Sequence, residues 1–331
     1  MQQPNFWNSV NLVAVSLLPL SFLYSIISKA NLFIQSLSKY HPKTRVICVG
    51  NINIGGTGKT QVVLKLSEIF LKNGLKICIV MQGYNSKLAK KNYATIVDIK
   101  KHSATDVGDE PLMLASKLEK YENAKIIINN CKKTSIKFAE KLHPDIIIMD
   151  DGMQNESIKK HSSILVIDGQ FGFGNYFTVP AGPLRESVKS GVKKVDAAII
   201  IRKDSKLITQ QLLDYSIPIF HGEIVPERYK FLKNKKVFAF CAIGKPEKFF
   251  TSLKNCGIYP DETKTFSDHY MYTDCDIKNI IEKYAKKYII FTTDKDYVKI
   301  PEHYKRYIKS FSIKLSIKEK NFNNFVLSLI K

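Results

Sequence analysis

The sequence contains no CxxC pair and little arginine, and each shortage excludes a class of site. Its six cysteines are scattered, at positions 48, 78, 131, 241, 256 and 275. Cys48 and Cys78 lie in apolar segments, so we expect buried thiols in a reducing compartment and no cysteine metal site or disulfide. Only five of the 51 basic residues are arginine. Because proteins that read nucleic acid depend on bidentate arginine contacts, we predict no nucleic-acid partner.

The first 28 residues contain no charged side chain, although the whole chain carries a net charge of +21. They lack the basic region and the small-residue cleavage site of a secretory signal. The apolar stretch 10–27 is borderline for a membrane-spanning helix because asparagine, serine and proline interrupt it. We expect a helix in the membrane interface, with Trp7 near its start; a buried core helix is the alternative. The lysine excess favours an anionic partner, such as phospholipid or a phosphorylated substrate, or reflects composition bias alone.

A glycine-rich segment, GNINIGGTGKT at positions 50–60, follows an apolar run and precedes a helical pattern. This order is typical of a P-loop, in which backbone amides and a helix N-terminus surround phosphate oxygens. Lys59 is expected to reach the β- and γ-phosphates and Thr60 to ligate Mg²⁺. The strict motif has glycine where this chain has Asn53, which tolerates left-handed backbone angles better than most residues. The expected nucleotide contacts are Asn53, Gly55, Gly56, Thr57, Gly58, Lys59 and Thr60. An ordinary glycine turn is the alternative.

Apolar segments alternate with helical patterns along most of the chain. Strands are expected near 45–49, 76–80, 93–97, 125–128, 145–149, 163–167, 197–201, 236–242 and 288–291. The alternation predicts an α/β fold, with a P-loop-containing parallel sheet, helices on both faces and a smaller C-terminal α/β domain. Residues 220–226 have the composition of a linker. The predicted parts are a membrane-associating helical segment 1–40, a P-loop core 41–222 and a smaller C-terminal α/β domain 223–331.

Acidic residues follow one predicted strand and open one predicted helix. Asp150 and Asp151 end the apolar run 145–149, as in a Walker B strand, where a carboxylate holds Mg²⁺ directly or through water. Asp109 and Glu110 precede a helix, so they suit its N-terminus and are candidates for the base that accepts a hydroxyl proton. A strand-ending turn and a helix cap are the structural alternatives.

Two further positions carry chemistry that suits a phosphate-transferring site. Arg185 lies in a loop region rich in glycine and proline, where it favours phosphate or carboxylate binding; a structural pair with Glu186 is the alternative. His269 is flanked by Asp268 and Tyr270 and could orient an acid or a base. An ordinary surface histidine is the alternative there.

Together and in this order, the motifs resemble those of the tetraacyldisaccharide 4'-kinase family. The matching segments are 50–60, 108–111, 150–154, 172–175, 180–186, 268–269 and 292–296. The resemblance implies a P-loop kinase at the cytoplasmic face of the inner membrane, held there peripherally or by its N-terminus. Such an enzyme uses ATP and Mg²⁺ to phosphorylate the 4'-hydroxyl of a lipid disaccharide 1-phosphate, giving lipid IVA in lipid A biosynthesis.

The resemblance also implies roles for individual residues, with His269 of the closing domain paired to Asp109. The expected catalytic residues are Asp109, His269 and Lys59. The expected metal ligands are Thr60, Asp150 and Asp151. The expected substrate contacts are Glu110, Gln154, Asn175 and Arg185. We expect a monomer on a phospholipid surface.

Several positions depart from the family pattern or from rival patterns. Gln82 replaces an arginine of the family and is not carried over as a ligand; Asn155 replaces a histidine, and Gln61 a proline. The alternative function is a membrane-associated P-loop ATPase of the partitioning type, but Ile54 stands where that type has its signature lysine. A GTP-binding switch would need an Asn-Lys-x-Asp tetrad, which the chain lacks. A non-catalytic membrane-binding protein is a third class.

Overall fold

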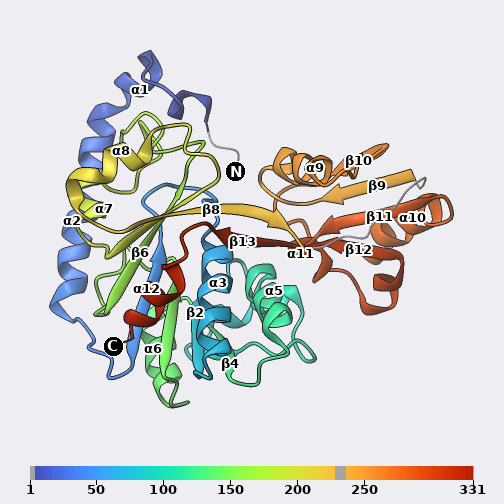
Figure 1. Ribbon diagram of the computed structural model, residues 1–331, viewed down its shortest axis with the longest axis horizontal. Helices are drawn as coiled ribbons and strands as arrows, with labels where there is room; N and C mark the ends of the chain where they lie inside the picture. Colours follow the sequence, from blue (N-terminus) through green and yellow to red (C-terminus); the bar gives the residue numbers. More distant parts are fainter. Residues whose placement is uncertain (1–3, 228–235, 331) are drawn as a thin grey trace.

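Two mainly parallel β-sheets form the framework of the chain (Figure 1). The computed structural model describes residues 4–227 and 236–330; the predicted segments that begin at 1 or end at 331 lie partly outside these residues. The strands of the first sheet are β1 (Arg45–Gly50), β2 (Ile77–Met81), β3 (Thr95–Ile96), β4 (Ala124–Ile128), β5 (Ile146–Asp150), β6 (Ser162–Asp168), β7 (Ala197–Ile201), β8 (Ile219–Pro226) and β13 (Ile313–Ile317). The strands of the second are β9 (Lys236–Cys241), β10 (Glu262–Thr265), β11 (Tyr288–Thr293) and β12 (Ile308–Phe311).

The first sheet has the order β13-β8-β7-β6-β1-β5-β2-β4-β3, and the second has the order β10-β9-β11-β12. All pairs are parallel except β3 with β4 and β13 with β8. The helices are α1 (Leu12–Ser16), α2 (Leu18–Leu37), α3 (Lys59–Lys72), α4 (Ala104–Val107), α5 (Asp109–Leu118), α6 (Lys132–Glu140), α7 (Val188–Val192), α8 (Ile208–Leu212), α9 (Pro246–Asn255), α10 (Asp274–Tyr284), α11 (Asp294–Tyr297) and α12 (Phe322–Ser328).

The central strand β1 lies between β5 and β6 and is apolar on both faces. Ile47 and Val49 pack in one cluster with side chains of α3, α5 and α12. Cys48 packs in the opposite cluster with Ile136 of α6 and Val192 of α7. A strand covered on both faces needs a continuous apolar sequence. Residues 46–49 of β1 form such a sequence. The predicted parallel α/β fold is confirmed, and Cys48 and Cys78 are buried as predicted.

The chain returns to the first sheet at its C-terminal end. Each predicted strand overlaps a strand of the structure, but the expected linker at 220–226 is wrong, because it lies in β8. Strand β8 is built into the sheet between β7 and β13. Its Phe220 contacts Phe322 and Phe325 of α12, with ring centroids 5.0 and 4.9 Å apart. The division of the chain into domains at residue 222 stays a prediction. It assigns β13 and α12 to the C-terminal domain, although both pack with the first sheet.

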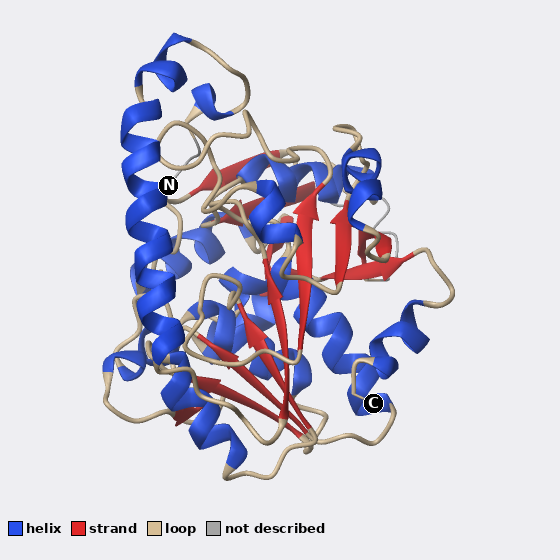
Figure 2. Ribbon diagram, turned by 90° about the vertical axis from the view of Figure 1, so that its left-hand side faces the viewer, coloured by secondary structure: helices blue, strands red, loops and turns tan. Residues whose placement is uncertain are grey.

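Helix α2 runs along one side of the molecule (Figure 2). Most of its apolar side chains are exposed. Its one buried residue is Ser21, whose hydroxyl donates to the Thr178 carbonyl at 2.8 Å and accepts from the Ala181 amide at 3.0 Å. Phe22 and Leu37 are 71 % and 72 % exposed. The alternative of a buried core helix is therefore wrong. Among the described residues, no helix has the length and hydrophobicity needed to cross a membrane.

Candidate active site

The P-loop connects β1 to α3, which begins at Lys59. Gly58 has a φ of 97°, a left-handed angle that favours glycine. A Cβ at Gly58 would also lie 2.7 Å from Cδ1 of Ile201, so both the backbone angle and the lack of space favour glycine here. The Lys59 ammonium donates to Asn51 Oδ1 at 3.0 Å and lies 3.6 Å from Asp151 Oδ1. The lysine is thus held at the carboxyl ends of β1 and β5, where phosphates bind in this class of sheet.

We expected Asn53 to replace glycine by accommodating a left-handed backbone angle, but its φ is not positive. Its side chain is buried, and Nδ2 donates to the Gly172 carbonyl at 3.0 Å. Its backbone forms a bridge with Leu184. Asn53 therefore ties the P-loop to the loop that follows β6, and its expected nucleotide contact stays a prediction.

The two carboxylates that end β5 have opposite pKa shifts. Burial raises the pKa of Asp150 to about 7, and its Oδ1 is buried without a hydrogen-bond partner. Burial acts in the same direction on Asp151, but the charges of Lys59 and Arg185 outweigh it and hold the pKa of Asp151 at about 2. Asp151 is therefore an ionised partner for the basic groups, whereas Asp150 has an unsatisfied oxygen that a cation would stabilise.

Two lysines that the sequence did not single out hold the loop after β5. Lys132, at the start of α6, is buried, and its ammonium donates to the carbonyls of Asp150 and Asp151, the latter at 2.7 Å. Lys160 donates to the carbonyls of Met153 and Asn155 at 3.1 and 2.9 Å. Each ammonium group therefore satisfies main-chain carbonyls at or just after the end of β5. Neither lysine lies in a recognisable motif. Lys132 comes to this loop from a helix 18 residues away in the chain, whereas Lys160 reaches carbonyls of its own loop, five and seven residues before it.

Arg185 and Gln154 extend the polar network from Asp151. The Arg185 guanidinium contacts both oxygens of Asp151, at 3.0 and 3.3 Å, and Oε1 of Gln154 at 3.1 Å. Gln154 Nε2 donates to Glu186 Oε1 at 3.1 Å. The suggested structural pair between Arg185 and its neighbour Glu186 is thus replaced by a pair with Asp151. Arg185 and Gln154, two of the expected substrate contacts, are thus linked to Lys59 through Asp151.

The second sheet brings its own polar groups to α5. His269 Nδ1 lies 2.8 Å from Asp109 Oδ2, and Lys295 Nζ lies 2.8 Å from Glu110 Oε1. Burial tends to raise the pKa of Asp109, but the hydrogen bond from His269 and the charge of Lys295 hold it at about 2. The charge of Glu110 acts on Asp150. The start of α5 therefore contacts the second sheet's polar groups, and the charge of Glu110 reaches the carboxylate that ends β5.

Asn175 differs from the other expected substrate contacts because it is buried in the fold of its own loop. Its Nδ2 donates to the Ala181 carbonyl at 2.8 Å and to the Phe6 carbonyl at 3.2 Å. These bonds fix the loop and the N-terminal segment against it. A direct contact between Asn175 and substrate stays a prediction.

The residues at the end of β5 fit a magnesium ion. Asp150 supplies a buried oxygen without a partner, and Thr60 supplies a hydroxyl in the first turn of α3. Within residues 4–227 and 236–330, no cluster of three or more His, Cys, Asp or Glu side chains could hold a metal. Because Mg²⁺ usually keeps water and phosphate oxygens as ligands, one or two protein ligands suffice.

A glycine loop after β1, a lysine opening α3 and a carboxylate pair ending β5 define a P-loop nucleotide-binding protein. The family model described as Tetraacyldisaccharide-1-P 4'-kinase matches residues 13–331. The tetraacyldisaccharide 4'-kinase of Paramagnetospirillum magneticum is 36 % identical over 317 residues, which are 95 % of this chain and 94 % of that one. That of Rickettsia typhi is 36 % identical over 298 residues, 89 % of this chain and 88 % of that one.

A solved structure supports the same assignment. The crystal structure of "apo" form LpxK from Aquifex aeolicus in complex with ATP has a TM-score of 0.77 and 26 % identity, and the match covers 96 % of this chain and 99 % of that chain. The chain belongs to the tetraacyldisaccharide 4'-kinase family. It is a kinase, as the sequence predicted, and this membership favours the kinase over the partitioning-type ATPase.

Proposed function

We propose that the chain transfers the γ-phosphoryl group of ATP to the 4'-hydroxyl of a tetraacyldisaccharide 1-phosphate, giving lipid IVA and ADP. The observation that carries the proposal is the 2.8 Å contact between Asp109 and His269. It joins a carboxylate at the start of α5 to an imidazole from the loop that follows β10. Such a pair suits the removal of a proton from a sugar hydroxyl.

The reaction forms a bond from the 4'-oxygen to the γ-phosphorus, breaks the bond to the bridging oxygen of ADP and releases the hydroxyl proton to the enzyme. Asp109 is a weak base alone, because its pKa is held at about 2. When the proton of neutral His269 is on Nδ1, the ring donates to Asp109, and Nε2 is the basic nitrogen. The pair then accepts the proton as a unit, late in a loose transition state.

The phosphate chain is held from the opposite side. The backbone amides of residues 55–60 and the Lys59 ammonium bind the β- and γ-phosphates. Asp150 and Thr60 would hold Mg²⁺, which neutralises developing phosphate charge when bound. Arg185, Gln154 and Glu110 then orient the lipid phosphate and sugar, and closure of the second sheet over the P-loop excludes water.

A direct assay tests this function. Purified protein is incubated with radiolabelled ATP and the disaccharide 1-phosphate lipid, and the products are separated. Lys59→Ala should lower turnover by several orders of magnitude, because the lysine binds charge that grows in the transition state. Lys72→Ala, at the exposed last residue of the same helix, should behave as wild type. Near-normal transfer by Lys59→Ala would falsify the assignment.

The N-terminal segment binds the membrane surface in this proposal. The exposed apolar side chains of α2 and the net charge of +21 suit an anionic phospholipid interface at the cytoplasmic face of the inner membrane. We expect a monomer there. Deleting residues 1–28 should move the protein from the vesicle-bound to the free fraction in sedimentation with anionic vesicles. Equal binding of the truncated and intact chains would contradict the proposal.

A further inference from the structure

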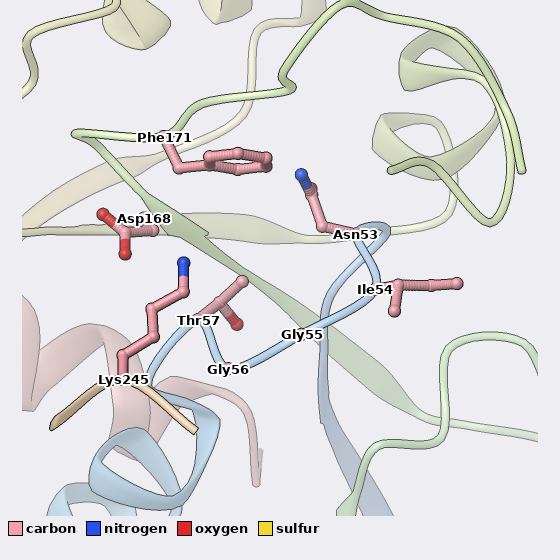
Figure 3. A pocket seen from close by; sticks show the side chains of 8 residues that line it. All are labelled: Asn53, Ile54, Gly55, Gly56, Thr57, Asp168, Phe171 and Lys245. Atoms are coloured by element: carbon pink, nitrogen blue, oxygen red, sulfur yellow. The ribbon is translucent and has the colours of Figure 1, made fainter. Parts of the chain in front are cut away.

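A small pocket beside the P-loop is built from both sheets (Figure 3). The glycine loop lines it with residues 53–57, the end of β6 contributes Asp168, and the turn that follows β6 contributes Phe171. The remaining lining residue is Lys245, which directly precedes α9 of the second sheet. In Figure 3, the Lys245 side chain extends toward the glycine loop, below Asp168 and Phe171. Its ammonium lies 5.5 Å from the centre of the Phe171 ring.

The pocket contains a polar atom that no protein group satisfies. Thr57 is 5 % exposed, and its Oγ1 is buried without a hydrogen-bond partner. A buried hydroxyl without a partner is costly, so this atom indicates a polar ligand in the pocket. Its position in the glycine loop places that ligand next to the backbone amides that suit phosphate oxygens.

The charge around the pocket favours an anion. Asp168 is the one carboxylate among the lining residues, and it is already paired with Arg202 at 2.7 Å and with Lys248 at 2.8 Å. Two cations on one carboxylate leave a net positive charge, to which Lys245 adds. An anionic group is therefore attracted here, whereas a neutral sugar is not.

The pair of Asp168 and Lys248 also fixes where Lys245 lies. Lys248 belongs to the first turn of α9, three residues after Lys245, and Asp168 ends β6 of the first sheet with 4 % of its surface exposed. Although burial opposes ionisation, Arg202 and Lys248 keep the pKa of Asp168 below its usual range. This ion pair holds the start of α9 next to the carboxyl end of β6 in the first sheet.

We propose that Lys245 binds the phosphate chain of the nucleotide, so that the second sheet completes the nucleotide site, and that Asp168 is a positioning residue that acts through Lys248. The inference rests on the proposed function, which supplies ATP as the nucleotide. The other anion available to the enzyme is the 1-phosphate of the lipid. The glycine-loop lining of the pocket favours the nucleotide.

Calorimetric titration of the full chain without lipid tests the inference. Lys245→Met should raise the Kd of ATP and ADP about tenfold, as expected for a lost charge-assisted contact, and should leave adenosine binding unchanged. Lys245→Arg should retain most of the ATP affinity. Lys254→Met, at the exposed end of the same helix, is the matched control and should bind as wild type.

Asp168→Asn tests positioning, because it should weaken ATP and ADP but not adenosine, whereas a general loss of folding would weaken all three. Unchanged ATP affinity in Lys245→Met overturns the inference. So does an increase in the KM of the lipid alone, which would assign Lys245 to the lipid phosphate. Either result leaves the proposed function standing, provided that the wild type phosphorylates the lipid. A wild type that binds ATP but transfers no phosphate would sink the proposed function instead.

Discussion

The interior of each sheet is held by apolar side chains, whereas the junction between the sheets is held by ion pairs. Ile47 and Ile148 in the first sheet and Phe238 in the second have no exposed surface. At the junction, acidic and basic groups meet in four pairs at 2.8 Å: Asp109 with His269, Glu110 with Lys295, Lys117 with Asp294, and Asp168 with Lys248.

The two kinds of contact respond differently to water. Separating apolar surfaces costs roughly 25 cal/mol for each Å² exposed, so each sheet stays intact. The junction pairs include the buried carboxylates of Asp109 and Asp168. Opening the junction returns both members of a pair to water, so the hydration regained offsets much of the attraction that is lost. We therefore expect the junction, rather than either sheet, to be the part of the molecule that opens and closes. Substitutions in the interior should lower stability, and substitutions at the junction should lower activity.

The largest effect is expected at the junction. Asp109→Ala and His269→Ala should each lower kcat by roughly 10²- to 10⁴-fold, the range of a lost general base, with little change in ATP affinity or Tm. The double variant should lose much less than the product of the single losses, because the pair acts as a unit. Steady-state kinetics and thermal unfolding measure both. Multiplicative losses would show that the residues act independently, and an active Asp109→Ala enzyme would make Glu110 the next candidate.

An interior substitution should show the reverse behaviour. Phe70 of α3 is fully buried, so Phe70→Ala should destabilise the folded protein by about 3–5 kcal/mol. The kcat of the protein that remains folded at low temperature should change little. Urea unfolding measures the stability, with Phe70→Leu as the control that leaves a smaller cavity. A stable but inactive Phe70→Ala protein would contradict the expectation that interior substitutions lower stability and junction substitutions lower activity.

Lys132 offers an intermediate case, because it is buried and yet borders the site. Lys132→Met keeps most of the side-chain volume but removes the donor to the carbonyls of Asp150 and Asp151. By analogy with outer-shell groups of metal sites, the apparent affinity for Mg²⁺ in the kinase assay should fall about 10- to 100-fold. Lys141→Met, an exposed position just after α6, is the control. A fall in Tm with unchanged Mg²⁺ dependence would assign Lys132 to stability alone.

Local sequence determined the parts of this protein that neighbouring residues build by themselves. Gly58 and Lys59 lie on either side of the start of α3, so a strand, a glycine turn and a helix suffice to predict a P-loop. The apolar run before Asp150 likewise predicted a buried strand with its carboxylate at the ligand end. The pairing of Asp109 with His269 came from the family resemblance, since 160 residues separate them.

Only the tertiary structure decided how distant segments meet. Residues 220–226 resembled a linker because glycine, proline and charged residues interrupt them, yet β13 and α12 return from the end of the chain and cover them. Lys132 and Asp168 lie in no motif, and their roles arise from partners 18 and 80 residues away. Such contacts depend on how sheets and helices pack, because an ammonium or carboxylate gains a partner only where the fold excludes water and brings the opposite group near.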